Sequence, residues 1–264
     1  MFPVDHRNDT DRRIPQFPAR RHRPGHLPEL DARKMPKLPP SRFFPLAELA
    51  GDDGLLALGG SLASEWLVDA YRHGIFPWPF DEEGPLAWWS PDPRAVLELD
   101  ALHVSQRLRR TLRSGRFEVT CDRDFAGVIR GCATEGDRKG ATWITSEMIA
   151  AYTRLAELGV THSVEAWHED VLAGGVYGVA IGGFFAAESK FYRVRDASKV
   201  ALAHLVRHLA ARGYELLDIQ QLTPHTARLG AIEIPRSEYL TRLAEAMTLR
   251  VTFGDRLQSK WGDW

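Results

Sequence analysis

The sequence predicts an α/β protein in two folded parts, a small irregular domain followed by a larger α/β domain. Two aromatic and proline-rich stretches, GIFPWPF and WWSPDPR, lie between Phe43 and Arg94 and are typical of a compact domain with little regular structure. After Arg94, segments with the period of strands alternate with segments with the period of helices. The expected parts are a disordered, basic, proline-rich tail over 1–40, the small domain over 41–93, the larger domain over 94–250 and a C-terminal tail over 251–264.

The composition is that of a soluble globular protein. Of the 264 residues, 44% are apolar and 26% are charged. No apolar run approaches the roughly 18 residues of a membrane span, and the N-terminus lacks the apolar run of a secretory signal. The two cysteines, Cys121 and Cys132, are too few for a disulfide framework. We therefore expect a cytoplasmic protein with two ordinary thiols and no membrane association.

The first forty residues differ in charge from the rest of the chain. They hold nine Lys or Arg against five Asp or Glu, a charge of +4, so the remainder of this −1 chain carries −5. They also hold eight of the sixteen prolines and show no hydrophobic period, so they cannot bury enough apolar surface to offset their ordering entropy. Any nucleic-acid site on the folded part must therefore be a local basic patch.

Helix caps and hydrophobic period predict the elements of both domains. In the small domain, Ser64 is expected to cap a helix that carries Trp66, Leu67 and Tyr71 and ends at Gly74. In the larger domain a tight IGG turn joins two consecutive strands as a hairpin. The expected helices of that domain begin at Ser105, at Thr145 or Ser146 and at Asp196 or Ser198, and its expected strands cover 117–122, 161–170, 171–180, 184–191 and 214–220.

Two of these strands carry polar residues where a buried strand would be apolar. In YELLDIQ, a period of two places Asp218 and Gln220 on one face. An acid and an amide at the end of a strand can meet a ligand in a crevice; the alternative is an edge strand whose polar face is in water. In FFAAESKF, Glu188 and Lys190 likewise share a face, where they pair with each other or, if buried, need other partners.

Aromatic side chains could contact nucleic acid. A tryptophan that stacks on a nucleobase contributes about 1–3 kcal/mol. Burial in a core is the commoner explanation for any one tryptophan, although for Trp78, in a loop, the two explanations are more evenly matched. The unusual set is Trp78, Trp88, Trp89 and Trp143.

A run of arginines lies on and just after the helix that Ser105 is expected to cap. Leu108 and Leu112 of this helix face the core, so the arginines form either a solvated helix face or a patch that binds phosphates. His204 and His208 are four apart on another helix, but without an HExxH sequence or a third ligand they do not indicate a metal site. The run consists of Arg107, Arg109, Arg110, Arg113 and Arg116.

Ten segments together resemble the leucyl/phenylalanyl-tRNA–protein transferase family, from about Phe44 to about Leu243. WWSPDPR and GIFPW are the most specific, and the order of the segments is also that of the family. The resemblance implies a small N-terminal domain followed by an acetyltransferase-like (GNAT) domain with a mixed, mostly antiparallel sheet. The segments are GLLALGGSL, AYRHGIFPW, LAWWSPDPRAVL, GATWIT, AYTRLAELGVTHSVEAW, LAGGVYGVAIG, AESKF, DASKVAL, LLDIQ and HTARLGAIEIPR.

The resemblance also implies a reaction and its partners. Leucyl- or phenylalanyl-tRNA donates its aminoacyl group to a protein that begins with Arg or Lys, and the product is degraded through the N-end rule. No cofactor is needed, because the ester to tRNA is already activated, and a monomer is expected. By position in the motifs, the implied site residues are Trp78, Trp143 and Tyr71 for adenosine, Asp218, Gln220 and Glu188 for the reaction, and Val176, Phe185, Lys190 and Leu217 for the aminoacyl side chain.

One departure from the family pattern concerns the aminoacyl pocket. The family's GESMF stretch is AESKF here, so Lys190 replaces a methionine. Its stem could line the pocket wall while its ammonium reaches solvent, or the donor preference could change towards a polar or acidic group. The family's DCQ is DIQ here, so Ile219 replaces a cysteine on the face opposite Asp218.

Two other functions compete with this interpretation. One is an acyl-CoA-dependent N-acetyltransferase of the same fold, which would need an Arg/Gln-x-x-Gly-x-Gly/Ala loop that cradles pyrophosphate at a helix N-terminus. No glycine of the chain has Arg or Gln three positions before it. The other is a protein that binds the tRNA end without transferring its amino acid.

Overall fold

Segments rich in apolar residues form two β-sheets in the described part of the chain. A computed structural model describes residues 37–80, 84–135 and 142–258, so most of the predicted tail over 1–40 lies outside it. The smaller sheet is antiparallel and has the strand order β1-β3-β2. Its strands are β1 (Leu55–Leu58), β2 (Phe76–Pro77) and β3 (Ala87–Trp89).

The larger sheet has seven described strands in the order β10-β4-β9-β8-β7-β6-β5. Among these, β8 and β9 are parallel and the other neighbours are antiparallel. This confirms the predicted α/β class with a mixed, mostly antiparallel sheet. The strands are β4 (Arg94–Val96), β5 (Glu118–Cys121), β6 (Thr161–His168), β7 (Val171–Ile181), β8 (Phe184–Tyr192), β9 (Leu216–Gln220) and β10 (Ile232–Ile234).

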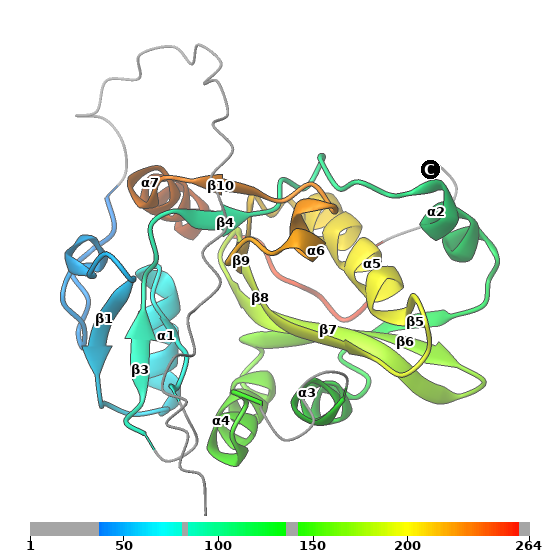
Figure 1. Cartoon of the computed structure of the whole chain (residues 1–264), viewed down its shortest axis with the longest axis horizontal. Coiled ribbons are helices and arrows are strands. Elements are labelled where there is room, and N and C mark those ends of the chain that lie inside the picture. The colour runs from blue at the N-terminus through cyan, green and yellow to red at the C-terminus, as the bar shows by residue number, and fades with distance from the viewer. Residues whose placement is uncertain (1–36, 81–83, 136–141, 259–264) are drawn as a thin grey trace, which may run out of the picture. The chain divides into compact units, whose positions relative to one another are not determined.

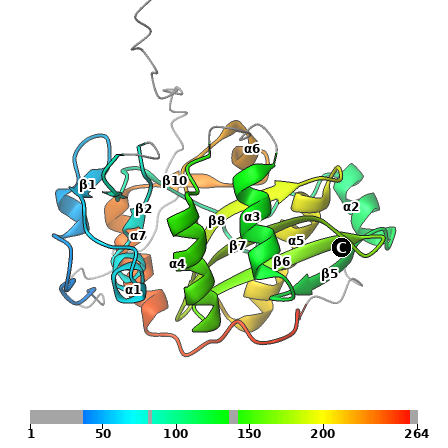
Figure 2. The ribbon, with the colours of Figure 1, turned by 90° about the horizontal axis from the view of Figure 1, so that it is seen from below.

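Helices cover both faces of the larger sheet (Figures 1 and 2). α5 (Ala197–Arg212) packs on one face, with α2 (Gln106–Arg113) against it, and α3 (Phe125–Thr134) and α4 (Ser146–Glu157) pack on the other. None of the described helices is long and apolar enough to cross a membrane. The remaining helical elements are η1 (Ala47–Leu49), α1 (Ser64–Arg72), α6 (Pro224–Ala227) and α7 (Arg236–Met247).

Local sequence signals account for several helix ends. The Ser105 and Thr145 side chains accept hydrogen bonds from backbone N–H groups in the first turns of α2 and α4, as predicted. Gly213 ends α5 with a φ of 84°, a conformation that glycine adopts without strain. The prediction for α1 is wrong by one position, because Ala63 is the N-cap and Ser64 is the first helical residue.

Three of the described α-helices, α3, α6 and α7, and several short strands are absent from the predicted elements. α3 begins after Asp124, whose side chain accepts from the Gly127 N–H, but its sequence FAGVIRGCAT contains two glycines that weaken a helical signal. Strands of two to four residues, such as β2 and β10, are too short to show a period. Tertiary pairing within the sheets therefore decides these segments.

The two sheets belong to one compact unit. The predicted boundary between 41–93 and 94–250 stays a prediction. Part of the expected C-terminal tail is packed, since Phe253 is buried and its carbonyl accepts from His208 Nε2 at 2.7 Å. The Gln258 N–H donates to Nδ1 of the same imidazole at 3.0 Å, so both ring nitrogens of His208 are used structurally.

Candidate functional site

The backbone departs from regular strand geometry at neighbouring points of β8 and β9. A register shift between Tyr177 and Gly178 of β7 leaves Glu188 as an extra residue in β8. Against β4, the extra residue of β9 is Ile219, and the strand ends at Gln220, whose φ of 63° lies in the left-handed region. Bulges redirect side chains and are frequent next to active sites. This part of the sheet is therefore the candidate site.

A glycine on β7 makes room for the bulge. A Cβ atom at Gly178 would lie 2.1 Å from the carbonyl oxygen of Ala186 and 2.4 Å from the Phe185 ring. Any larger residue would push β8 away from β7 at this point. The position of Glu188 thus depends on a close approach that only glycine permits.

Glu188 is the centre of a buried hydrogen-bond network. The Gln220 side-chain amide donates to one carboxylate oxygen at 2.7 Å, and the Tyr152 hydroxyl donates to the other at 3.4 Å. The hydroxyls of Tyr71 and Tyr152 are hydrogen-bonded to each other. Burial raises the pKa of Glu188 to about 8, so the neutral acid is its main form at pH 7.

Asp218 lies behind Gln220, and its carboxylate is fully buried. It accepts hydrogen bonds from Arg94 Nε at 3.0 Å, from Arg94 Nη2 at 2.7 Å and from the Tyr239 hydroxyl at 2.9 Å. Its Oδ1 also accepts from the backbone N–H of Gln220 at 2.8 Å, which stabilises the left-handed conformation there. The alternative of a wet edge strand is wrong, because β9 lies between β4 and β8.

Arg94 connects three parts of the molecule behind the site. It donates to the carbonyl oxygen of Gly74 at 3.1 Å. Its guanidinium carbon lies 4.7 Å from the centre of the Phe76 ring and 4.6 Å from that of Tyr239, which are cation–π distances. We call Arg94, Asp218 and Tyr239 the buried clamp, because together they join β4, β9 and α7 to the segment around β2.

A cavity of about 280 Å³ opens on the other side of Gln220. Its walls come from β7, β8, β9, α5 and α6 and from Leu97 just after β4, and the tryptophans Trp78 and Trp143 complete it. Much of the wall is apolar, including Ile219, which faces the cavity while Asp218 faces away. The remaining lining residues are Leu97, Val176, Ala187, Glu188, Ser189, Lys190, Leu202, Gln220, Gln221, Thr223, His225, Thr226, Leu229 and Ala231.

The cavity brings together six of the ten residues that the resemblance implies. The other four are at most 1% exposed and lie behind the wall: Tyr71 in the Glu188 network, Asp218 in the buried clamp, and Phe185 and Leu217 paired across β8 and β9. Their direct contact with a substrate would require movement of the wall. The six lining residues are Trp78, Trp143, Val176, Glu188, Lys190 and Gln220.

Trp78 and Trp143 stack directly on one another at the cavity. Their ring centroids are 5.1 Å apart and the ring planes differ by 25°. A base can stack on the outer face of the pair as it stands. A base can lie between the two rings only if they move apart, because each face of the base must keep an aromatic contact distance from one ring.

Basic groups gather at the cavity wall formed by β8 and α6. Lys190 and His225 both line the cavity. The pKa of His225 is lowered by burial and then by the positive charges of Lys190, Lys199 and Arg228. Lys190, Lys199 and Arg228, which we call the cationic rim, are therefore close enough to His225 to interact with it electrostatically, and the lowered pKa keeps His225 itself neutral at pH 7.

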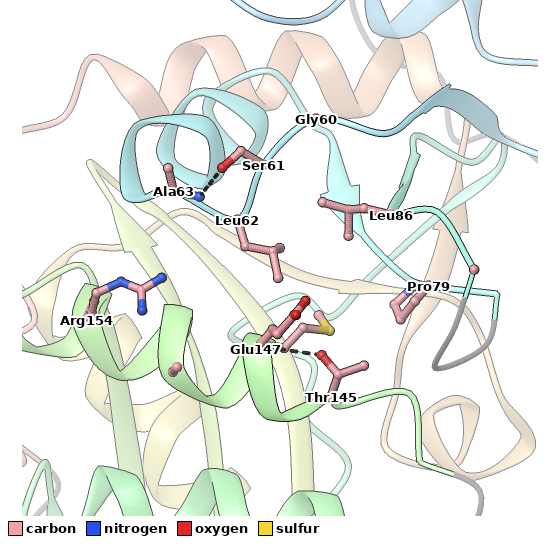
Figure 3. A pocket seen from close by; sticks show the side chains of 12 residues that line it. Gly60, Ser61, Leu62, Ala63, Pro79, Leu86, Thr145, Glu147 and Arg154 are labelled. Atoms are coloured by element: carbon pink, nitrogen blue, oxygen red, sulfur yellow. Dashed lines mark hydrogen bonds between the residues drawn. The ribbon is translucent and has the colours of Figure 1, made fainter.

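A second, larger hollow of about 490 Å³ lies between the segment before α1 and the helix α4 (Figure 3). Ser61, Leu62 and Ala63 form one side, and Glu147 and Arg154 form the other. The hollow is also lined by residues that closely follow Trp78 and Trp143 in the sequence. It contains no member of the Glu188 network, so the smaller cavity is the better candidate for chemistry.

The predicted arginine patch lies on the outer side of α2. Leu108 and Leu112 are buried against α5, as expected, and four of the five arginines are exposed. Arg107 forms an ion pair of 3.3 Å with Asp196, which also pairs with Lys199 of the cationic rim at 3.6 Å. Asp196 therefore links the patch to the rim. The patch consists of Arg107, Arg109, Arg110, Arg113 and Arg116, of which Arg109 is half-buried.

Several functional residues were missed by the sequence reasoning. Arg94 belongs to the WWSPDPR motif, and a charged residue in an apolar setting is a signal that could have identified it. Tyr152 lies on the apolar stripe of α4, and Tyr239 lies on a helix that was not predicted, so neither carried a separate signal.

The family described as leucyl/phenylalanyl-tRNA protein transferase matches residues 96–244, and its N-terminal domain matches residues 60–92. The chain belongs to this family. A leucyl/phenylalanyl-tRNA–protein transferase of Anaeromyxobacter sp. (strain K) is 55% identical over 213 residues, which cover 80% of this chain and 91% of the relative. One from Nitratidesulfovibrio vulgaris (strain DP4) is 53% identical over 205 residues, or 77% of this chain and 87% of the relative.

Two solved structures are weakly similar to part of the chain. A GCN5-related N-acetyltransferase from Kribbella flavida has a TM-score of 0.34 at 13% identity, covering 64% of this chain and 59% of that one. L-PGS from Bacillus licheniformis has a TM-score of 0.37 at 10% identity, covering 71% of both chains.

Proposed function

We propose that the chain transfers leucine or phenylalanine from aminoacyl-tRNA to the N-terminal Arg or Lys of an acceptor protein. Family membership supports this activity. The observation that carries it is the combination, in one cavity, of the Trp78–Trp143 stack with the paired Glu188 and Gln220 side chains. The tryptophans offer a face to the terminal adenosine of the tRNA, and the amide and carboxyl groups lie where the ester would sit.

The proposed reaction is an attack of an amine on an ester. The acceptor α-amine bonds to the carbonyl carbon of the aminoacyl group, and the bond from that carbon to the ribose oxygen of the tRNA breaks. The proton lost by the amine passes to that oxygen. Because the ester is already activated, positioning the two reactants supplies much of the acceleration, and no cofactor is invoked. Gln220 can hydrogen-bond the ester or the amine, and the apolar wall around Val176 accepts the aminoacyl side chain.

Glu188 is suited to the acceptor in two ways. Its pKa of about 8 is close to the roughly 7.7–8.0 of an unperturbed α-amine, so a proton can move between them at little cost. When Glu188 is ionised, its carboxylate can instead attract the guanidinium or ammonium group of the acceptor side chain, which lowers the pKa of Glu188. Asp218, whose oxygens accept hydrogen bonds from Arg94 and Tyr239, serves as a positioning residue for Gln220 in this proposal.

The cellular setting follows from the substrates. Charged tRNA and nascent or cleaved proteins meet in the cytoplasm, so we place the chain there, acting as a monomer. Acceptors modified with leucine or phenylalanine would be degraded through the N-end rule. The arginine patch of α2 is the proposed contact with tRNA phosphates.

The test is transfer of labelled leucine. The chain is incubated with labelled leucyl-tRNA and three peptides that differ only in an N-terminal Arg, Lys or Ala. We expect label on the Arg and Lys peptides and almost none on the Ala peptide. A parallel reaction replaces leucyl-tRNA by labelled acetyl-CoA. Acetyl transfer without leucyl transfer would assign the competing N-acetyltransferase function, and binding of leucyl-tRNA without any transfer would assign the non-catalytic one.

A further inference from the structure

The cationic rim places positive charge at the cavity, and binding of an apolar aminoacyl group does not require such a charge. Lys190 comes from β8 and His225 from α6, and both line the cavity. Of the lining residues that the structure describes, Glu188 is the one acid, and it is bonded to Gln220 and Tyr152. Since the lowered pKa leaves the His225 imidazole neutral at pH 7, the positive charge of this wall is that of the Lys190 ammonium, which attracts an anionic group.

The surroundings of the rim are also suited to an anion. Asp196, the acid of this region, is already bonded to Lys199 at 3.6 Å and to Arg107 at 3.3 Å. A lysine and an imidazole that converge on one cavity can make charge-assisted hydrogen bonds to phosphate or carboxylate oxygens.

We propose that Lys190 and His225, supported by Lys199 and Arg228, form an anion-binding subsite of the donor cavity. The subsite rests on the proposed function and specifies its substrate. Two parts of a donor could supply the anion: the phosphate on the 5′ side of the terminal adenosine, or the carboxylate of an acidic aminoacyl group. Phosphate binding would leave the donor preference apolar, whereas carboxylate binding would change it.

A binding experiment tests the phosphate source without any transfer reaction. Quenching of tryptophan fluorescence measures the affinity of the wild type and of Lys190→Met for AMP and for adenosine. If the phosphate occupies the subsite, the wild type prefers AMP, and Lys190→Met reduces that preference about tenfold while adenosine binding changes less than twofold. Lys190→Arg keeps the charge and should retain most of the preference.

A transfer experiment tests the carboxylate source. The ratio of transfer from glutamyl-tRNA to transfer from leucyl-tRNA is measured for the same variants, with an Arg-starting peptide as acceptor. If a donor carboxylate occupies the subsite, this ratio falls about tenfold in Lys190→Met, because the substitution removes its charge partner. Arg123→Met, which removes one positive charge beside β5 at the far edge of the sheet, is the matched control and should leave both preferences unchanged.

The outcomes separate the subsite from the proposed function. A fall in either preference supports the subsite and identifies the source of the anion. If both preferences are unchanged in a folded Lys190→Met, the subsite is refuted and the lysine stem is only a part of the wall. An AMP preference that depends on Lys190, without transfer from any tRNA, would refute the proposed function and leave the subsite intact.

Discussion

The two sides of β9 differ in how fully their polar groups are occupied. On the buried side, the Asp218 carboxylate accepts four hydrogen bonds, three of them from Arg94 and Tyr239. On the cavity side, the Gln220 side chain donates one bond to Glu188 and lines an open space. A site that binds reactants needs a rigid support in which the polar groups are hydrogen-bonded within the protein. It also needs a face whose polar groups can bond to the reactants. The strand provides both within three residues.

The largest expected effect is on the buried side. Asp218→Asn leaves Arg94 buried without its counter-ion, and loss of one partner of a buried ion pair costs about 3–5 kcal/mol. We expect that loss in the free energy of unfolding, measured by urea denaturation. Glu98→Gln is the control, since Glu98 forms an ion pair of 2.7 Å with Arg242 that is partly exposed and should cost less than about 1 kcal/mol. Equal losses would show that burial of the clamp has no energetic importance.

The next largest effect is the pH dependence that Glu188 gives to the stability of the protein. Its pKa in the folded chain, about 8, lies above the ordinary 4.5, so the folded state retains a proton that the unfolded chain releases between these values. Glu188 therefore makes the protein less stable as pH rises from about 4.5 to about 8, by at most about 1.4 kcal/mol per pH unit. Unfolding of the wild type and of Glu188→Gln is compared at pH 5, 6, 7 and 8. The stability of the wild type should fall relative to the variant over this range; a constant difference would contradict the raised pKa.

The tryptophan pair is expected to have an intermediate effect, on binding alone. Trp78→Ala removes one stacking surface, and stacking on an aromatic side chain contributes about 1–3 kcal/mol per base. Adenosine affinity, measured by calorimetry, should fall accordingly. Trp167→Ala is the control, because this indole contacts Thr120 and Arg123 beside β5. Equal binding by Trp78→Ala and the wild type would remove the adenosine assignment.

The smallest effect is expected at the exposed arginine patch. Arg110→Ala should weaken tRNA binding modestly and lower the slope of log affinity against log salt concentration by about 0.7–0.9, the value of one phosphate contact. Filter binding at several salt concentrations measures the slope. An unchanged slope would show that α2 presents a solvated face and does not contact tRNA.

From the sequence, the order of the main elements and several residues of the cavity can be predicted. The roles of these residues are predicted less well. A period of two places Glu188 and Lys190 on one face, and both line the cavity, although a bulge intervenes that no periodicity reveals. The same period places Asp218 with Gln220, whereas the left-handed φ of Gln220 separates them. The Asp218 oxygen that accepts from the Gln220 N–H also accepts from Arg94, 124 residues away from Asp218, and local sequence pattern does not contain such a tertiary contact.

In the proposed reaction, Gln220 and Glu188 contact the reactants, while Asp218 only positions Gln220. The most direct measurement compares kcat for leucyl transfer to an Arg-starting peptide in the wild type, Gln220→Ala and Tyr239→Phe. Tyr239→Phe removes one bond to Asp218 and leaves Arg94 in place. We expect a loss of about 10²–10³ in kcat for Gln220→Ala, as for removal of a transition-state hydrogen-bond donor, and a loss below tenfold for Tyr239→Phe. A folded Gln220→Ala variant with the kcat of the wild type would show that Gln220 does not act on the reactants.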